Sequence, residues 1–127
     1  MPNRIEGTIH PSTLTPFLKI YVIGPQQKTL ECVAILDTGF AGEVILPEPQ
    51  INALGLVQIG TDDVELANGE IVELDLFRGK IQWLGKVREV AVGATRSEDV
   101  LVGTLLFEQC VVHLDFLHGM VEVIQSE

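Results

Sequence analysis

The stretch from Glu31 to Pro47, ECVAILDTGFAGEVILP, is the most informative part of this sequence. An apolar run ends at Leu36 and leads directly into Asp37, and a second apolar run begins at Val44 and ends before Pro47. Short apolar runs interrupted by Gly, Asn or Pro are typical of β-strands. The stretch therefore predicts two strands joined by a loop that begins with the tripeptide Asp37-Thr38-Gly39.

A carboxylate fixed at the end of a strand suggests one kind of hydrolysis. Two carboxylates a few ångströms apart cannot both ionise, so they share one proton. One of them can then activate a water while the other protonates a carbonyl oxygen. Gly39 would let the backbone come close to a second such loop, and the Thr38 hydroxyl would hydrogen-bond across to it. An Asp-x-Gly tripeptide is also common in ordinary turns, so the tripeptide alone leaves that alternative open.

The stretch resembles the active-site segment of the retropepsin-like aspartic proteases, and within them small stand-alone bacterial members with a DTGF motif. Two later blocks support the resemblance in the same order. Val64 to Val72 resembles the flap, a hairpin that closes over the substrate in retroviral proteases. Val100 to Phe107 resembles the second family signature, in which apolar residues, a glycine and a short helix pack behind the catalytic loop. The resemblance implies an all-β fold, a closed β barrel with one or two short helices and one active-site lobe per chain.

The resemblance also implies a set of site residues. The catalytic residues would be Asp37, Thr38 and Gly39, and the substrate-binding residues Phe40, Ala41, Leu66, Ala67, Asn68 and Gly69. Three positions depart from the family pattern. Phe40 replaces a small residue and would narrow a subsite; Leu105 replaces an Asp or Asn and would remove a hydrogen bond near the loop. Gly69 is the single glycine of the flap tip, which would reduce the flap's mobility.

The number of motifs predicts a homodimer. No second Asp-Thr-Gly or Asp-Ser-Gly occurs in the chain, so a pair of aspartates requires two copies related by a two-fold axis. The expected function is an aspartic endopeptidase acting on extended polypeptides. The alternative is a non-catalytic β-barrel that binds a partner or oligomerises, because a fold does not fix a function.

The length of 127 residues predicts a single domain, residues 1–127, with residues 1–14 as an N-terminal arm that plugs or frames the cleft. The segment from Pro47 to Gly55 has the prolines and the final glycine of a short helix, and a second short helix is expected after Gly103. The expected strands are Phe17 to Ile23, Leu30 to Leu36, Asp63 to Leu66, Ile71 to Phe77, Gly79 to Trp83, Lys86 to Val92, Cys110 to Phe116 and Met120 to Ile124. The turn from Gly24 to Lys28 predicts that the first two form a hairpin.

The composition argues against several other classes of protein. The net charge is −10, from 8 basic and 18 acidic residues, and the basic residues form no run, which argues against nucleic acid and membranes as partners. No apolar stretch is long enough to span a bilayer, and the start of the sequence lacks a signal peptide's apolar region, so a cytoplasmic location is expected. Cys32 and Cys110 lie in apolar runs and are expected to be free, with a disulfide left open. His10, His113 and His118 lack metal-ligand spacing, so no metal and no cofactor is expected.

Overall fold

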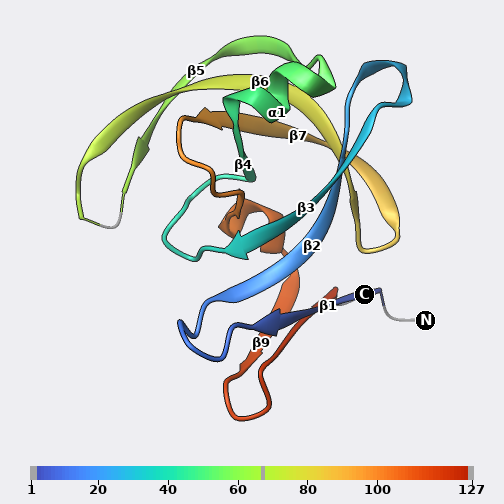
Figure 1. The fold of residues 1–127 in the computed structure, drawn as a ribbon, viewed down its shortest axis with the longest axis vertical. Coiled ribbons are helices and arrows are strands. Elements are labelled where there is room, and N and C mark those ends of the chain that lie inside the picture. Colours follow the sequence, from blue (N-terminus) through green and yellow to red (C-terminus); the bar gives the residue numbers. More distant parts are fainter. Residues whose placement is uncertain (1–2, 67, 126–127) are drawn as a thin grey trace.

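A computed structural model describes residues 3–66 and 68–125, and it consists mostly of β-strands with one α-helix (Figure 1). The elements, with η for a 3-10 helix, are β1 (Arg4–Ile9), β2 (Pro16–Ile23), η1 (Pro25–Gln27), β3 (Thr29–Leu36), β4 (Val44–Pro47), α1 (Glu48–Leu54), β5 (Val57–Glu65), β6 (Ile71–Trp83), β7 (Lys86–Thr95), β8 (Leu101–Val102), η2 (Thr104–Phe107), β9 (Cys110–Asp115) and β10 (Met120–Gln125). No helix in these described residues is long and apolar enough to cross a membrane.

The described strands form one sheet in the order β5-β6-β7-β4-β8-β3-β2-β1-β10-β9. Two contacts, β3 with β8 and β4 with β7, are parallel, and the others are antiparallel. Val22 and Ile23 of β2 also pair with β6, so six of the strands form a ring. This ring is uneven, because β8 contributes only Leu101–Val102. The mostly-β fold is thus confirmed, and an even, closed barrel stays a prediction.

The core lies inside this ring. In β2 the buried side chains are Leu18, Ile20 and Val22, at every second position, as expected for a strand with one face on the core. The other completely or almost completely buried side chains come from eight further elements; they are Ala34, Val44, Leu46, Ile51, Ile81, Val92, Val102, Leu106, Val121 and Val123. Because β3, β4 and β8 all contribute to this core, the loop between β3 and β4 is anchored at both ends.

Two of the local predictions are confirmed in detail. β2 and β3 form an antiparallel hairpin, with pairs from Phe17–Ile35 to Ile23–Thr29. Helix α1 ends at Gly55, which has φ +70° and whose N–H bonds to the carbonyl of Asn52. The left-handed conformation explains why a glycine follows the helix.

The structure also corrects the expected boundaries. Ile71 to Phe77 and Gly79 to Trp83 are one continuous strand, β6, because Gly79 is buried against Val92 and Leu56 and not in a turn. Strand β5 begins at Val57, well before the expected Asp63, and contains a bulge between Gln58 and Gly60. The short helix after Gly103 is the 3-10 helix η2.

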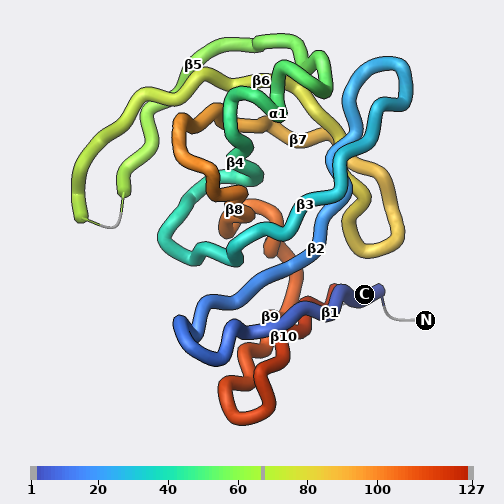
Figure 2. Tube along the Cα trace, viewed as in Figure 1, coloured from blue at the N-terminus to red at the C-terminus, as the bar shows by residue number. Residues whose placement is uncertain are grey.

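The segment that we expected to be an arm contributes a strand to the sheet. Strand β1 pairs with β10 from Arg4–Ile124 to Thr8–Met120, and it also contacts β2. The first and last strands therefore lie side by side, and β1, β9 and β10 form a layer below the ring in Figure 2.

Candidate active site

Asp37 lies at the end of β3, where two strands from distant parts of the chain meet. β3 runs parallel to β8, with the pairs Ile35–Leu101 and Leu36–Val102. The Asp37 N–H donates to the carbonyl of Val102 at 2.9 Å, one position beyond the last of these pairs. The backbone of Asp37 is thereby fixed to the sheet, as the sequence predicted for a carboxylate that follows a buried strand.

The loop turns immediately after Asp37 and orients its carboxyl group. The Gly39 N–H donates to Oδ1 of Asp37 at 2.8 Å, and the Phe40 N–H donates to the Asp37 carbonyl at 3.2 Å. Asp37 is half-buried, whereas Thr38 and Gly39 are exposed. The tripeptide therefore presents a held carboxylate next to a small, accessible piece of backbone, where a second chain can approach closely.

The start of η2 holds the far side of this loop. The backbone N–H groups of Thr104 and Leu105 donate to the carbonyls of Phe40 and Gly42 at 3.0 and 3.1 Å. Gly103 makes this contact possible: a Cβ there would lie 2.5 Å from the Phe40 carbonyl oxygen and closer still to that of Gly42. Figure 2 shows the segment after β8 running next to the loop. The first and third sequence blocks are thus brought together.

Phe40 supports the loop with its side chain. It is only 6% exposed, and its ring lies where a Cβ at Gly42 or Gly103 would be. The sequence resemblance implies a substrate-binding role for Phe40, which stays a prediction. The structure places the ring against the two glycines, with one side at the edge of a hollow that Ala41 also lines.

Glu43 is a positioning residue of this loop that the sequence analysis did not identify. Its Oε2 accepts a hydrogen bond from Arg88 at 2.7 Å, and its Oε1 accepts one from the Ala91 N–H at 2.9 Å. Its own carbonyl accepts a hydrogen bond from the Gly103 N–H at 2.9 Å. Glu43 therefore ties the loop to β7 and to η2 at once. Its partners lie far along the sequence, so no local pattern indicated this role.

Two hollows lie beneath the β5–β6 hairpin, which arches over the loop in Figure 1, and the loop lines the smaller of them. The smaller, of about 90 Å³, is lined by Phe40 to Val44 on one side and by hairpin residues such as Val64 and Leu74 on the other. The larger, of about 230 Å³, is lined by the same two hairpin residues and by Ile45 and Leu101. Both hollows are largely apolar, so they fit apolar side chains of an extended ligand.

The hairpin tip is held by its own hydrogen bonds. The Leu66 N–H donates to the Glu70 carbonyl at 2.8 Å, and the Glu70 N–H donates to Oδ1 of Asn68 at 2.9 Å. Gly69 has φ +85°, a conformation that favours glycine. Leu66 lines the larger hollow, whereas Asn68 and Gly69 are exposed at the tip. Ala67, also expected to bind substrate, lies outside the described residues.

The described residues contain no cluster of three or more His, Cys, Asp or Glu side chains with metal-binding geometry. The arrangement around Asp37 is instead a single carboxylate on a rigid loop, under a hairpin and beside apolar hollows. In chemical terms this arrangement supplies one oriented carboxylate beside exposed backbone.

The chain matches no known protein-family model, and no curated protein matches it in sequence. Among solved structures it is similar to EIAV protease, determined with the inhibitor HBY-793, with a TM-score of 0.51 and 17% identity over 78% of this chain and 90% of that one. The foamy viral protease-reverse transcriptase, determined with an RNA/DNA hybrid, aligns with a TM-score of 0.46 and 17% identity. That alignment covers 72% of this chain but only 12% of the viral chain.

The likeness to EIAV protease defines the class of fold. The chain has the fold of the retroviral proteases, on the likeness to EIAV protease. The mostly-β, retroviral-protease-like fold that the sequence resemblance implied is therefore confirmed, whereas the closed barrel and the single active-site lobe stay predictions. The narrower assignment to a bacterial group with a DTGF motif stays a prediction.

Proposed function

We propose that two copies of this chain form an aspartic endopeptidase, in which Asp37 of each subunit faces the other across a two-fold axis. The observation that carries this proposal is the position of Asp37: its backbone is bonded to Val102, its Oδ1 to Gly39, and its loop lines an apolar hollow. A carboxylate used only in a turn would not need support from β8, η2 and β7 together. The DTGF motif and the retroviral-protease fold both support the proposal.

The two carboxylates would share one proton, because they could not both ionise at such a short separation. The ionised carboxylate takes a proton from water, and this water attacks the carbonyl carbon of the peptide bond. The protonated carboxyl donates its proton to the carbonyl oxygen, which gives a tetrahedral diol. Proton transfer to the amide nitrogen then lets the carbon–nitrogen bond break. Thr38 would brace the two loops against each other through its hydroxyl group.

The substrate would lie extended beneath the β5–β6 hairpin, with its side chains in the hollows. Leu66, Val64 and Leu74 would contact it from above, and Ile45 and Leu101 from below. The apolar lining favours hydrophobic residues next to the cleaved bond. We place the reaction in the cytoplasm, since Cys32 and Cys110 are free, as is usual in a reducing compartment.

The experiment that tests this proposal is digestion of a complex peptide mixture at pH 4, 5 and 7 with the wild type and with Asp37→Asn. Asp75→Asn serves as a matched control, because Asp75 is an exposed carboxylate that lines neither hollow. Wild type and Asp75→Asn should cut beside apolar residues, fastest on the acidic side of neutral. Asp37→Asn should be slower by about 10²–10⁴-fold or more. If all three proteins are folded dimers and none cuts, the chain is a non-catalytic binding module.

A further inference from the structure

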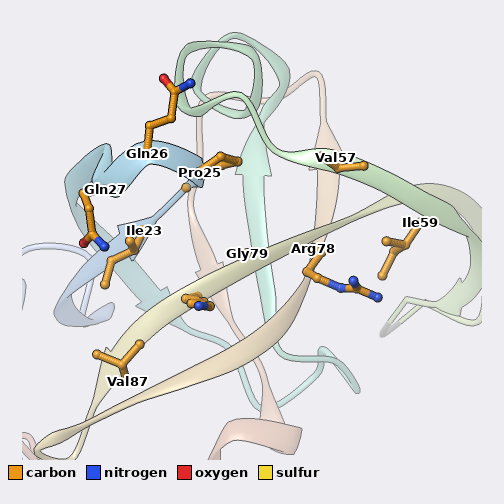
Figure 3. Close-up of a pocket in the computed structure, with 11 residues that line it drawn as sticks. Ile23, Pro25, Gln26, Gln27, Val57, Ile59, Arg78, Gly79 and Val87 are labelled. Atoms are coloured by element: carbon orange, nitrogen blue, oxygen red, sulfur yellow. The ribbon is translucent and has the colours of Figure 1, made fainter.

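A second cavity, of about 540 Å³, lies at the base of the β5–β6 hairpin (Figure 3). Its walls are the start of β5, the middle of β6, the start of β7 and the turn at η1. None of its lining residues belongs to the loop after Asp37 or to the two hollows under the hairpin. The volume lies within the range that is typical of small-molecule pockets. The candidate active site therefore does not account for this cavity.

Two cations line the cavity. Arg78 and Lys80 are two positions apart on β6, so both point to the same side of the strand. Gly79 between them is buried, and a Cβ there would face Val92 and Leu56. Neither cation forms an ion pair within 4.0 Å among the residues that the structure describes. The lining contains no acidic residue, although acidic residues outnumber basic ones by 18 to 8 in the chain.

The rest of the wall is apolar or neutral. Val57, Ile59 and Val87 are 64%, 47% and 55% exposed, which is unusual for three aliphatic side chains that surround one cavity. In Figure 3 the side chain of Arg78 points towards Ile59. Ile59 lies in the bulge of β5, between Gln58 and Gly60, so it has no partner in the ladder with β6. The cavity thus combines two solvent-exposed cations with an open aliphatic rim of Val57, Ile59 and Val87.

We propose that this cavity binds a small organic carboxylate with an aliphatic tail. The carboxylate would take hydrogen bonds from the Arg78 guanidinium and the Lys80 ammonium, the former suited to a two-point contact. The tail would cover Val57, Ile59 and Val87 and remove them from water. The attraction between the carboxylate and the two cations gives this ligand a higher affinity than an alcohol with the same tail. Contact between the tail and the aliphatic rim gives it a higher affinity than a small anion without a tail. The proposal is independent of the peptidase activity, and the binding should persist in Asp37→Asn.

Glu89 is the one acid opposite these cations in the sheet register. It pairs with Lys80 across β6 and β7, but it does not line the cavity. As a nearby negative charge it would weaken the binding of an anion. Glu89→Gln should therefore bind the carboxylate more tightly than the wild type. At a purely apolar site this substitution would not change the affinity.

The test is a titration of the full chain with octanoate, followed by the methyl NMR signals of Val57, Ile59 and Val87. Octan-1-ol has the same tail without the charge, and acetate has the charge without the tail. Octanoate should shift the three signals in a saturable way, and the other two probes should not. Arg78→Gln and Lys80→Gln should each weaken octanoate binding by about tenfold. Arg96→Gln is the matched control, because Arg96 is 95% exposed and does not line the cavity.

Three results would overturn the proposal. Equal binding of octanol and octanoate would show an apolar site, and equal binding of acetate would show a simple anion site. Octanoate affinity that is unchanged in Arg78→Gln and Lys80→Gln, both with wild-type backbone spectra, would remove the assigned head-group contacts. Saturable binding of octanoate that needs both cations would establish the site.

Discussion

Arg88 donates a hydrogen bond to Glu43 across 45 positions of sequence, with its nitrogen 2.7 Å from Oε2. This ion pair joins β7 to the loop that begins at Asp37. The Glu43 side chain is 17% exposed and that of Arg88 41%, so the pair is partly shielded from water. The family pattern led us to expect that Leu105 removes a hydrogen bond near the loop. In this chain the Leu105 N–H still bonds to the carbonyl of Gly42, and Glu43 adds a second anchor.

Glu43→Ala should lower the free energy of unfolding by about 1–3 kcal/mol, because the Ala91 N–H and the Arg88 guanidinium both lose their acceptor. Urea unfolding followed by the fluorescence of Trp83, the single tryptophan, measures this change. Glu31→Ala is the matched control: Glu31 pairs with Lys19 at 3.2 Å, and both side chains are 56% exposed. Exposed pairs contribute less than about 1 kcal/mol. Equal losses in the two variants would contradict the role that we give to Glu43.

Gly103→Ala should distort the loop after Asp37. The added Cβ would meet the carbonyl oxygens of Phe40 and Gly42, which are backbone atoms and cannot rotate away. We expect a loss of about 1–3 kcal/mol in stability, together with a loss of peptide hydrolysis. Gly79→Ala is the comparison variant: the atom nearest to its added Cβ is a Val92 methyl carbon at 3.2 Å, which can move. The loss of stability in Gly79→Ala should therefore be smaller than in Gly103→Ala. A Gly103→Ala protein with wild-type stability and activity would show that the close approach is not required.

Mixing the wild type with an excess of Asp37→Asn should inhibit hydrolysis. A mixed dimer would contain one carboxyl group and one amide. The amide cannot share a proton with the carboxyl group, so the mixed dimer would be inactive. With a tenfold excess of the variant and random exchange, only about one tenth of the wild-type chains stay in active dimers. The test is the peptidase activity after subunit exchange. The control is the activity after mixing with the same excess of Asp75→Asn. Activity that does not change with added Asp37→Asn would rule out a site shared by two subunits.

The pH dependence of stability should report the burial of Cys32. Burial, with a smaller effect of Glu31, raises the pKa of the Cys32 thiol to about 11. The unfolded state releases this proton at a lower pH, so the thiol's contribution is fully present below an unfolded pKa of about 8.5. It is lost as the pH rises towards 11. Between about pH 8 and 10.5 the free energy of unfolding should therefore fall more steeply with pH for the wild type than for Cys32→Ala. The same pH dependence in both proteins would contradict this.

The two cysteines should also differ in their reaction with a thiol reagent. Cys32 is 6% exposed, and Cys110 is partly exposed, although burial raises its pKa as well. Because the thiolate is the reactive form, both should react slowly at pH 8, and Cys110 should react first. Mass spectrometry of peptides after timed alkylation measures the order. Modification of Cys32 in the folded protein before Cys110 would contradict it.

The features that sequence alone predicts are those whose cause is local. The hairpin at Gly24 to Lys28 and the glycine that ends α1 each depend on neighbouring residues. Asp37 was found because an apolar strand, a Thr and a Gly follow one another in a short stretch. These local features appear in the folded chain because the tertiary contacts stabilise the same conformations.

The features that sequence missed depend on distant partners. Strand β1 contains Arg4, Glu6 and Gly7 and becomes a strand by pairing with β10. The start of β5 contains Gly60 and acidic residues typical of a loop, and it becomes a strand by pairing along β6. Strand β8 has only two residues and exists because β3 and β4 lie on either side of it. The anchoring of Glu43 by Arg88 is invisible for the same reason.

The dependence of the Asp37 loop on β8 and η2 has a consequence for the synthesis of the protein. Thr104 is 64 positions beyond Phe40, whose carbonyl it binds. At typical elongation rates this segment is made about 3–13 s after the loop. Until then the loop lacks the partners that hold it, since contacts between distant positions form late in folding. A nascent chain therefore carries its aspartate in an unformed site, and the proposed peptidase would stay inactive towards neighbouring nascent proteins until η2 has been made.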